Sequence, residues 1–377
     1  MKHNWEYKKL GEVCEVLDSK RKPVTKKDRK EGQYPYFGAM GIQDYVDAYI
    51  FDGDYLLVGE DGAKWGANDK SAFQVHGKCW VNNHAHILRI NETVVNTTFI
   101  EYYLVGKDLS SYITGAVVPK LTQASLVSIP IPLSPLPIQQ KIVSELDKLS
   151  LIIEKKKQQL TELDRLAQAI FYDMFGDPDS IFTKWNHLTL EDVCSNIVDC
   201  PHTTPIKSEI PTLYPCIRTS ELKGGSIHWE TMQYVTEDEY NNRVSRLIPQ
   251  VGDIVYGREG SFGDAVILPS GWYFCLGQRT MLFRANRDFV NIVFLHRVLI
   301  SEVVFRQAKE KNVASTVAHV NVKDIKKFII PIPPLALQQS FAAKIEAIER
   351  QKELINASIR EAQTLFDARM DYWFNEA

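Results

Sequence analysis

The sequence contains no long hydrophobic run and no overall excess of positive charge. No apolar stretch approaches the roughly 20 residues that a membrane-spanning helix needs, and the first residues contain no signal-peptide core. These absences predict a cytoplasmic protein with no membrane partner. The 377 residues carry 44 lysines and arginines against 47 acidic residues, so the formal net charge is -3. This charge disfavours DNA binding unless basic residues are concentrated in local segments.

Cysteine is sparse, and the six cysteines are dispersed without a CxxC pair. We therefore expect reduced, mostly buried thiols rather than a disulfide framework. Cys200 and His202 are close in sequence, but no second ligand pair stands at zinc-finger spacing. His84 and His86 alternate along an expected strand and share one face, which favours a hydrogen-bonding role over metal binding. No metal site is predicted.

The sequence also lacks the motifs of common enzyme classes. It has no GxxxxGK[ST] phosphate loop, no GxSxG elbow, no HExxH pair and no GxGxxG after a strand. The Asn/Asp-Pro-Pro-aromatic motif of adenine methyltransferases is absent as well. The acidic residues of 176–184 are better explained by a polar linker than by a nuclease site. These absences predict a binding protein without catalytic residues.

A repeated element is the main feature that the sequence does contain. A proline-rich segment leads into a long helix twice, as IPIPLSPLPIQQ (129–140) and as IPIPPLALQQ (330–339). Apolar residues then recur at alternating steps of four and three, which is typical of positions a and d of a coiled coil. The predicted seams contain Ile142, Leu146, Leu149, Ile153, Leu160 and Leu163 in the first helix, and Phe341, Ile345, Ile348, Ile355 and Ile359 in the second.

Two lysines interrupt these seams at positions that are not duplicated. Lys156 lies in the first seam and Lys352 in the second, and the equivalent positions in the other copy of the repeat are Ile355 and Ile153. Polar seam residues can specify the register of a helix pair. We predict that these lysines fix the register and do not bind DNA.

The segments before the helices are duplicated too. Trp5 and Trp185 begin similar stretches, and a Gly-Asp turn before a strand and a glycine-rich loop recurs at 53–67 and 252–265. Periodicity predicts strands within 34–57, 73–76, 84–90 and 275–285, and helices within 97–113 and 290–311. The predicted fold class is α+β, with two tandem-duplicated mixed α/β domains separated by two long antiparallel coiled-coil helices in pseudo-two-fold symmetry. The expected boundaries are 1–134 for the first domain, 135–175 for the central helix, 176–184 for a linker, 185–333 for the second domain and 334–377 for the C-terminal helix.

Together these motifs resemble the specificity subunit of type I restriction-modification systems, over essentially the whole chain. In that family the proline-rich segment commonly reads I-P-[IL]-P-P-L-x-[EQ]-Q, and the first copy here has two extra residues, Leu133 and Ser134. Residues 37–63 and 80–90 look like one common type of recognition domain. DCPHTTP (199–205) resembles the D-G-P-H-[GT]-T-P stretch of another type, with Cys200 where the family usually has glycine.

The resemblance implies that each domain is a target recognition domain reading one half of a bipartite, asymmetric site in double-stranded DNA. It implies that the helix pair sets the unread spacer and docks two methyltransferase subunits, which restriction subunits with motor and nuclease activity join. S-adenosylmethionine, ATP and magnesium would bind those partners, and none would bind this chain. Two major-groove readers lie about one turn, roughly 34 Å, apart. A helix over 142–170 spans about 43 Å, which suits such a spacer.

Candidate DNA contacts follow from the chemistry of base and phosphate recognition. Arginine and lysine suit phosphates and guanine, glutamine suits adenine, and apolar groups suit thymine methyls. The basic segment 19–31, the glycine loops and the DCPHTTP stretch supply such residues. The predicted contacts are Lys20, Arg21, Lys22, Lys26, Lys27, Met40, Gln43, Lys64 and Trp65 in the first domain, and His202, Thr203, Thr204, Arg218, Arg258, Ser261 and Arg279 in the second.

Two other interpretations stay open at this stage. The chain could be a non-enzymatic scaffold or adhesion-type protein that dimerises through its coiled coils and carries two carbohydrate- or peptide-binding domains. It could also be a nuclease or methyltransferase in its own right, although the missing motifs disfavour this. Salt-dependent DNA binding in the presence of a methyltransferase partner would separate the first from a specificity subunit. Turnover by the isolated chain would support the second.

Overall fold

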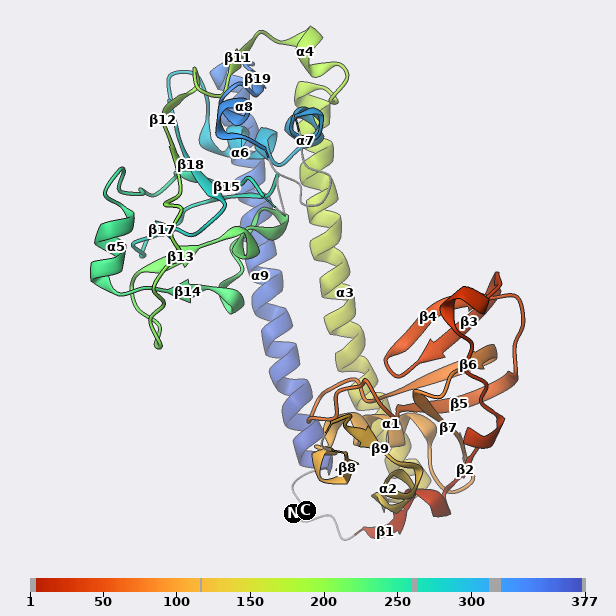
Figure 1. Ribbon diagram of the computed structural model, residues 1–377. Coiled ribbons are helices and arrows are strands. Elements are labelled where there is room, and N and C mark those ends of the chain that lie inside the picture. The colour runs from red at the N-terminus through yellow and green to blue at the C-terminus, as the bar shows by residue number, and fades with distance from the viewer. Residues whose placement is uncertain (1–4, 116, 260–262, 312–319, 375–377) are drawn as a thin grey trace. The chain divides into compact units, whose positions relative to one another are not determined.

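The computed structural model describes residues 5–115, 117–259, 263–311 and 320–374 (Figure 1). The chain forms two compact units. Unit 1 comprises residues 1–158 and 355–377, and unit 2 comprises residues 159–354. Each unit therefore combines one globular domain with a part of both long helices.

The two long helices are the predicted heptad helices. Helix α3 is Leu136–Phe175 and helix α9 is Leu335–Phe374, and each has 40 residues. In unit 2, Asp164 accepts a hydrogen bond from Lys352 at 2.9 Å, and Phe171 packs against Phe341. Because the residue number rises along α3 while it falls along α9, the two segments run antiparallel in this unit.

The predicted seam is only partly buried. Six of its residues are at most 9% exposed, namely Ile142, Leu146, Ile153, Phe341, Ile345 and Ile348. The other five are half-buried, namely Leu149, Leu160, Leu163, Ile355 and Ile359. Most of the six buried residues pack into the hydrophobic cores of the two domains. For example, Ile142 and Leu146 belong to the same core cluster as Phe99 of the first domain.

Unit 1 is built on a six-stranded sheet with the strand order β2-β7-β5-β6-β3-β4. Only the β3–β6 pair is parallel. The strands are β2 Cys14–Val16, β3 Glu31–Gly38, β4 Gly41–Val46, β5 Phe51–Gly59, β6 Ala72–Val81 and β7 Ala85–Ile90. Alternation along β5 sends Leu56 and Val58 into one core with helix α1 (Thr97–Gly106) and sends Tyr55 and Leu57 into a second core on the other face.

The remaining elements of unit 1 surround this sheet. Helix α1 ends at Gly106, earlier than the 97–113 that periodicity predicts, and a single 3-10 turn follows at Ser110–Tyr112. The other elements are β1 Glu6–Lys9, α1 Thr97–Gly106, β8 Ile113–Thr114, β9 Lys120–Leu121, α2 Gln123–Ser128 and β10 Pro130–Leu133.

Unit 2 divides its strands between two sheets, with the orders β12-β18-β15-β16 and β14-β13-β17. The strands are β12 Cys194–Asp199, β13 Pro215–Ile217, β14 Gln233–Tyr234, β15 Ile254–Gly257, β16 Ala265–Ile267, β17 Cys275–Leu276 and β18 Thr280–Ala285. A further pair is formed by β11 His187–Thr189 and β19 Ile329–Pro331. The helices are α4 Ile181–Lys184, α5 Glu237–Arg243, α6 Ile292–Leu299, α7 Glu302–Glu310 and α8 Val322–Lys326.

Two predictions for unit 2 need correction. The helix expected over 290–311 is interrupted at Ser301, whose side chain accepts a hydrogen bond from the Val303 backbone and caps α7. The segment 176–184 is more than a polar linker, because it contains α4 and a fully buried Ile181. Asp177 fixes its start by accepting bonds from the backbone of Asp179 and Ser180.

The predicted duplication is visible in matching backbone bonds. Strand β1 pairs antiparallel with β10, and β11 pairs antiparallel with β19, so each proline-rich segment is a strand paired with the opening of its own domain. Leu10 N donates to Ile129 O at 2.8 Å, and Leu190 N donates to Phe328 O at 2.7 Å. The expected two domains with mixed sheets and two long helices are confirmed.

One buried glutamine in each unit ties the long helix to its domain. Gln139 Oε1 accepts from the backbone nitrogen of Asn96 at 2.8 Å, and Gln338 Oε1 accepts from that of Asn291 at 2.8 Å. Each Nε2 donates to a carbonyl of the preceding proline-rich segment, at 2.7 and 2.8 Å. A buried amide needs partners at both ends, and both copies meet this need in the same way.

The six cysteines are free thiols, as the sequence predicts. Burial raises the pKa of the Cys14 and Cys194 thiols to about 12, and the nearby Asp18 adds to the effect at Cys14. Such thiols remain protonated at neutral pH and are poor nucleophiles.

Candidate nucleic-acid interface

The basic segment 19–31 of unit 1 is anchored to strands β6 and β3 of the sheet. Trp80 Nε1 donates to Lys22 O at 2.6 Å, and Val24 N donates to the Tyr36 hydroxyl at 3.0 Å. The Arg29 guanidinium lies 4.1 Å from the centre of the Tyr36 ring. The predicted contacts Lys20, Lys22, Lys26 and Lys27 remain exposed. The segment therefore presents ammonium groups from an anchored backbone.

A chain of polar side chains joins three loops near this segment. Met40, at the tip of the β3–β4 hairpin, is 54% exposed. Gln43, which is exposed on β4, accepts a hydrogen bond from Asn82 Nδ2 at 3.1 Å. Asn82 in turn accepts from the backbone of His84, and the His84 ring bonds to Asp61 in the glycine loop. The structure thus brings Gln43 together with Asn82, which the sequence did not single out.

The glycine loop after β5 separates its two predicted contacts. Lys64 is exposed, whereas Trp65 is 9% exposed and belongs to the core cluster of unit 1. Trp65 Nε1 donates to Gly59 O at 3.0 Å. The indole therefore stabilises the loop from inside, and only Lys64 presents its side chain to solvent.

Arg21 is part of an internal ionic cluster. Its guanidinium bridges Glu60 at 2.6 Å and Asp18 at 3.2 Å, and Lys120 also reaches Glu60 at 2.8 Å. Burial opposes the charge on Glu60, but hydrogen bonds from Lys120 and Arg21 outweigh it and hold the pKa of Glu60 below its usual value. Asp18, Glu60 and the buried His86 have the atoms of a cation site, but the two basic side chains already neutralise the carboxylates.

In unit 2 the stretch 199–205 follows β12 as a surface loop. Cys200 is buried, and its backbone nitrogen donates to Thr280 O at 3.1 Å. In the described part of the chain, positive φ occurs at only two non-glycine residues, Asn68 and Arg279. The position where the family usually has glycine thus accepts cysteine without left-handed backbone strain.

The loop exposes three of the predicted contacts. His202, Thr203 and Thr204 all face solvent. His202 Nε2 lies 3.3 Å from the Asp199 carboxylate. Thr204 Oγ1 accepts a hydrogen bond from Gln278 Nε2 at 3.4 Å. Gln278, from the turn before β18, is a polar residue of this surface that the sequence did not reveal.

Two of the predicted arginines meet at this loop. Arg258 is 7% exposed and bridges Asp199 at 3.1 Å and Glu259 at 3.2 Å. Arg279 is exposed and pairs with Glu259 at 3.0 Å. Arg258 thus has an internal structural role, while Arg279 lies at the surface.

The other two predicted contacts of unit 2 lie elsewhere. Arg218 is half-buried and donates to Glu221 at 2.6 Å and to Thr231 O at 3.0 Å. Its Cγ lies 2.3 Å from where a β-carbon at Gly277 would be, so this arginine packs against the segment before Gln278. Ser261 lies outside the described residues.

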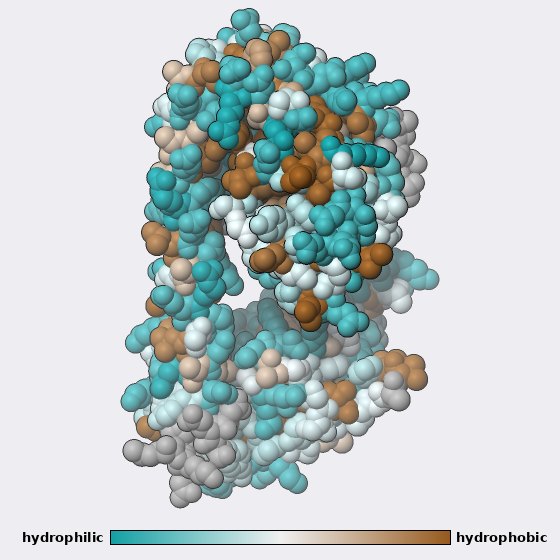
Figure 2. Space-filling view, turned by 90° about the vertical axis from the view of Figure 1, so that its left-hand side faces the viewer, coloured by the Kyte–Doolittle hydropathy of each residue, from teal (hydrophilic) through white to brown (hydrophobic). Residues whose placement is uncertain are grey.

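Hydrophobic side chains reach the surface of both units on the face that Figure 2 shows. On unit 2, Leu213, Ile248, Val251 and Tyr273 are each more than half exposed and line one groove. Exposed apolar patches of this kind mark binding surfaces more often than random surface.

Comparison with known proteins identifies the class to which this architecture belongs. A family model described as the type I restriction modification DNA specificity domain matches residues 2–165 and, separately, residues 183–364. The chain therefore belongs to this family. Each match covers the globular domain of one unit, as expected for a tandem duplication.

Individual relatives agree with this assignment. A protein of Haemophilus influenzae that is named as a type I restriction enzyme specificity subunit is 27% identical, over 98% of this chain and 94% of its own. The MjaVIII specificity subunit of Methanocaldococcus jannaschii is 21% identical over 93% of this chain and 87% of its own. The crystal structure of the type I restriction-modification S subunit from M. genitalium has the same fold, with a TM-score of 0.60 at 13% identity over 100% of this chain and 97% of that one.

None of the described helices combines the length and the apolar composition needed to cross a membrane.

Proposed function

We propose that the chain is the DNA-binding specificity subunit of a type I restriction-modification complex, in which each unit reads one half of a bipartite, asymmetric DNA site. The observation that carries the proposal is the double match to one family model, with one copy on each unit. Two copies of one scaffold perform the same task, and different loops on them select different ligands.

The loops support this division of labour. Unit 1 presents the anchored basic segment and the hairpin with Met40 and Gln43, whereas unit 2 presents the 199–205 loop beside Gln278. Ammonium groups suit phosphates, and amides, hydroxyls and apolar tips suit base edges. Since the two sets of side chains differ, the two half-sites should differ in sequence, and the whole target should be asymmetric.

We further propose that the long helices dock two methyltransferase subunits and set the length of the unread spacer. Both helices expose large apolar side chains, which water alone does not favour. In unit 1 these include Leu151 and Leu365, at 53% and 50% exposure, and in unit 2 Leu166 and Leu354, at 47% and 72%. We propose that the partner subunits cover these side chains, because exposed apolar patches are typical of protein–protein interfaces.

The chemistry would then reside in the partners. We propose that adenine methylation and ATP-dependent cleavage belong to the methyltransferase and restriction subunits. S-adenosylmethionine, ATP and magnesium would bind there, in the cytoplasm where chromosomal DNA is found. This chain would contribute only recognition and geometry, which agrees with its lack of sequence motifs for catalysis.

The test is to map methylation by the assembled complex. The chain is co-expressed with its methyltransferase subunit, and methylated adenines are located by single-molecule sequencing. We expect one bipartite target with two unrelated halves, and replacing residues 185–330 with another recognition domain should change one half only. An unchanged methylated sequence after this swap would refute the proposal. Salt-independent or absent DNA binding by the complex would instead favour the scaffold interpretation.

A further inference from the structure

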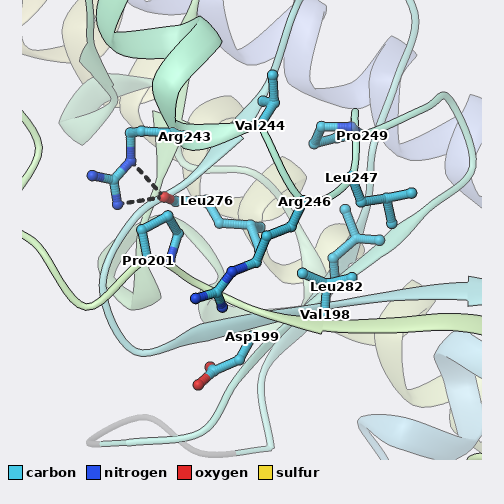
Figure 3. Close-up of a pocket in the computed structure, with 10 residues that line it drawn as sticks. All are labelled: Val198, Asp199, Pro201, Arg243, Val244, Arg246, Leu247, Pro249, Leu276 and Leu282. Carbon is cyan, nitrogen blue, oxygen red and sulfur yellow. Dashed lines mark hydrogen bonds between the residues drawn. The ribbon is translucent and has the colours of Figure 1, made fainter.

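Helix α5 ends in a buried arginine that joins separate parts of unit 2. Arg243 is 6% exposed. Its Nε and Nη2 donate to Leu276 O at 3.0 and 2.8 Å, as Figure 3 shows. Its Nη1 donates to Thr203 O at 3.3 Å and to Glu239 Oε1 at 3.2 Å. One guanidinium therefore links α5, β17 and the 199–205 loop.

The chemistry of this contact is specific to arginine. Burying a charged group is costly unless its donors are bonded, and here one carboxylate and two backbone carbonyls receive them. A guanidinium presents five donors in a rigid planar fork, so it can serve partners in several directions at once. A lysine ammonium is a compact point donor on a flexible stem and cannot reproduce the same set.

The two carbonyls belong to the segments that carry the exposed candidate contacts. Thr203 lies between His202 and Thr204, and Leu276 lies two residues before Gln278. The bond from Gln278 to Thr204 closes the two segments against each other on the outside. Arg243 holds them together on the inside.

A second cation lies three residues further along the chain, beyond the end of α5. Arg246 is exposed, and its guanidinium extends beneath Pro201 toward Asp199 (Figure 3). It belongs to the same small hollow as Arg243, but it faces solvent. Replacing the buried Arg243 therefore tests the positioning of the two segments, whereas replacing the exposed Arg246 tests a direct contact with DNA.

We infer that Arg243 is the positioning residue for base readout by unit 2. It fixes the 199–205 loop and the 275–279 segment relative to α5, so that His202, Thr204 and Gln278 form one preorganised surface. The inference rests on the proposed function, because it assumes that this surface reads one half-site. Arg243 itself is buried and does not touch the DNA.

The test uses the full chain with Arg243→Lys, assembled with its methyltransferase subunit. Methylation is measured on the wild-type target and on targets with single base changes in either half. We expect discrimination in the half read by unit 2 to fall by roughly tenfold, the scale of one misread base pair. Discrimination in the other half should be unchanged. Arg246→Ala should instead weaken binding to all sequences and reduce its salt dependence.

Arg284→Lys is the matched control. Arg284 also bonds a buried carboxylate, Asp253 at 2.9 Å, and a backbone carbonyl, Ile248 O at 2.9 Å, but it contacts neither loop segment. Arg284→Lys should lower the midpoint of thermal unfolding without altering base discrimination in either half of the DNA target. If it relaxes the same half as Arg243→Lys, general loosening of unit 2 explains both effects and the inference is overturned.

A second variant guards against misfolding. Should Arg243→Lys fail to yield a folded complex, Glu239→Ala removes only the carboxylate that holds the guanidinium and leaves both carbonyl bonds possible. It should relax the same half to a smaller extent, and unchanged discrimination would overturn the inference. If the wild-type complex does not methylate a bipartite site at all, the proposed function fails, whereas full discrimination by folded Arg243→Lys rejects the positioning role alone.

Discussion

In both units an arginine bridges two acidic side chains, but the arginine comes from a different segment in each unit. In unit 1 a guanidinium from the basic segment, Arg21, bridges Asp18 and Glu60. In unit 2 a guanidinium from the loop after β15, Arg258, bridges Asp199 and Glu259. Each bridge joins an aspartate to a glutamate of the glycine loop: Asp18 lies two residues after β2, and Asp199 is the last residue of β12. The arrangement is the same, although the residue that completes it has moved along the chain.

The scaffold, by contrast, is repeated without such changes. The strands that open each domain pair with the proline-rich segment, and Gln139 and Gln338 make equivalent bonds. The sheets between these anchors differ, with six strands in one sheet for unit 1 and two smaller sheets for unit 2. Buried backbone bonds therefore define the repeat, while the surface between them differs from one unit to the other.

The largest expected effect comes from breaking the two arginine bridges. Arg21→Gln and Arg258→Gln each remove the cation that two largely buried carboxylates share. Because Lys120 still pairs with Glu60 and Arg279 with Glu259, each change should destabilise the unit concerned by up to about 3 kcal/mol. Urea unfolding of each variant measures this loss. The exposed pair of Arg165 and Glu162 is the control, and Arg165→Gln should cost less than about 0.5 kcal/mol. If only one of the two variants is destabilised, the two arginine bridges are not equivalent.

Replacing the buried glutamines tests the shared scaffold. Gln139→Leu and Gln338→Leu each leave a backbone N–H and a carbonyl unsatisfied, which should cost about 2 kcal/mol in either unit. Gln140→Leu and Gln339→Leu change the exposed neighbours and should be close to neutral. Urea midpoints of the four variants give the comparison. A large effect for only one buried glutamine would show that the two anchors are not equivalent.

Acid should weaken unit 1 through Glu60. The folded-state pKa of Glu60 is lowered from 4.5, so its contribution is fully present above pH 4.5 and is lost as the pH falls through the folded pKa. Lys120→Met removes the hydrogen bond that lowers this pKa most, and the acid-induced loss should then begin at a higher pH. Unfolding midpoints between pH 7 and the acid transition measure the shift. An unchanged profile would contradict the assigned ionic cluster.

The smallest expected effect on stability concerns the two seam lysines. Lys352 is paired across the helices with the exposed Asp164, so Lys352→Leu should change the unfolding free energy by less than about 1 kcal/mol. With Lys156→Leu added, we expect slightly higher stability and methylation at sites of altered spacer length. Methylation of targets with one base pair inserted or removed in the spacer provides the measurement. Unchanged spacer discrimination would show that the lysines do not fix the register.

Local patterns predicted the repeated parts of the molecule well. The heptads located both long helices, because helix periodicity depends on residues three and four apart. The duplicated openings and proline-rich segments located both domains. The break at Ser301 and the short helix α4 were missed, since each depends on one capping side chain or one buried isoleucine rather than on periodicity.

The site was less predictable, because charge alone does not reveal where a side chain lies. Arg21, Arg258 and Trp65 had the residue types of DNA contacts, but the fold uses them internally. Glu60 is 39 residues from Arg21, and Asp199 is 59 residues from Arg258, so only the fold brings these pairs together. Asn82 lies in the family-like segment 80–90, but nothing in the sequence marks its side chain as a contact, and Arg243 and Gln278 belong to none of the motifs.

The tandem repeat, the two long helices and the family follow from the sequence alone, because they depend on periodicity and on short contiguous motifs. The tertiary structure decided which polar side chains face solvent and which are bonded inside. That decision depends on the free energy of burying a charge, which is acceptable only where distant carboxylates or carbonyls are brought within hydrogen-bonding distance. Arg243 is an example, because its charge can be buried only where the carbonyls of Thr203 and Leu276 accept its hydrogen bonds.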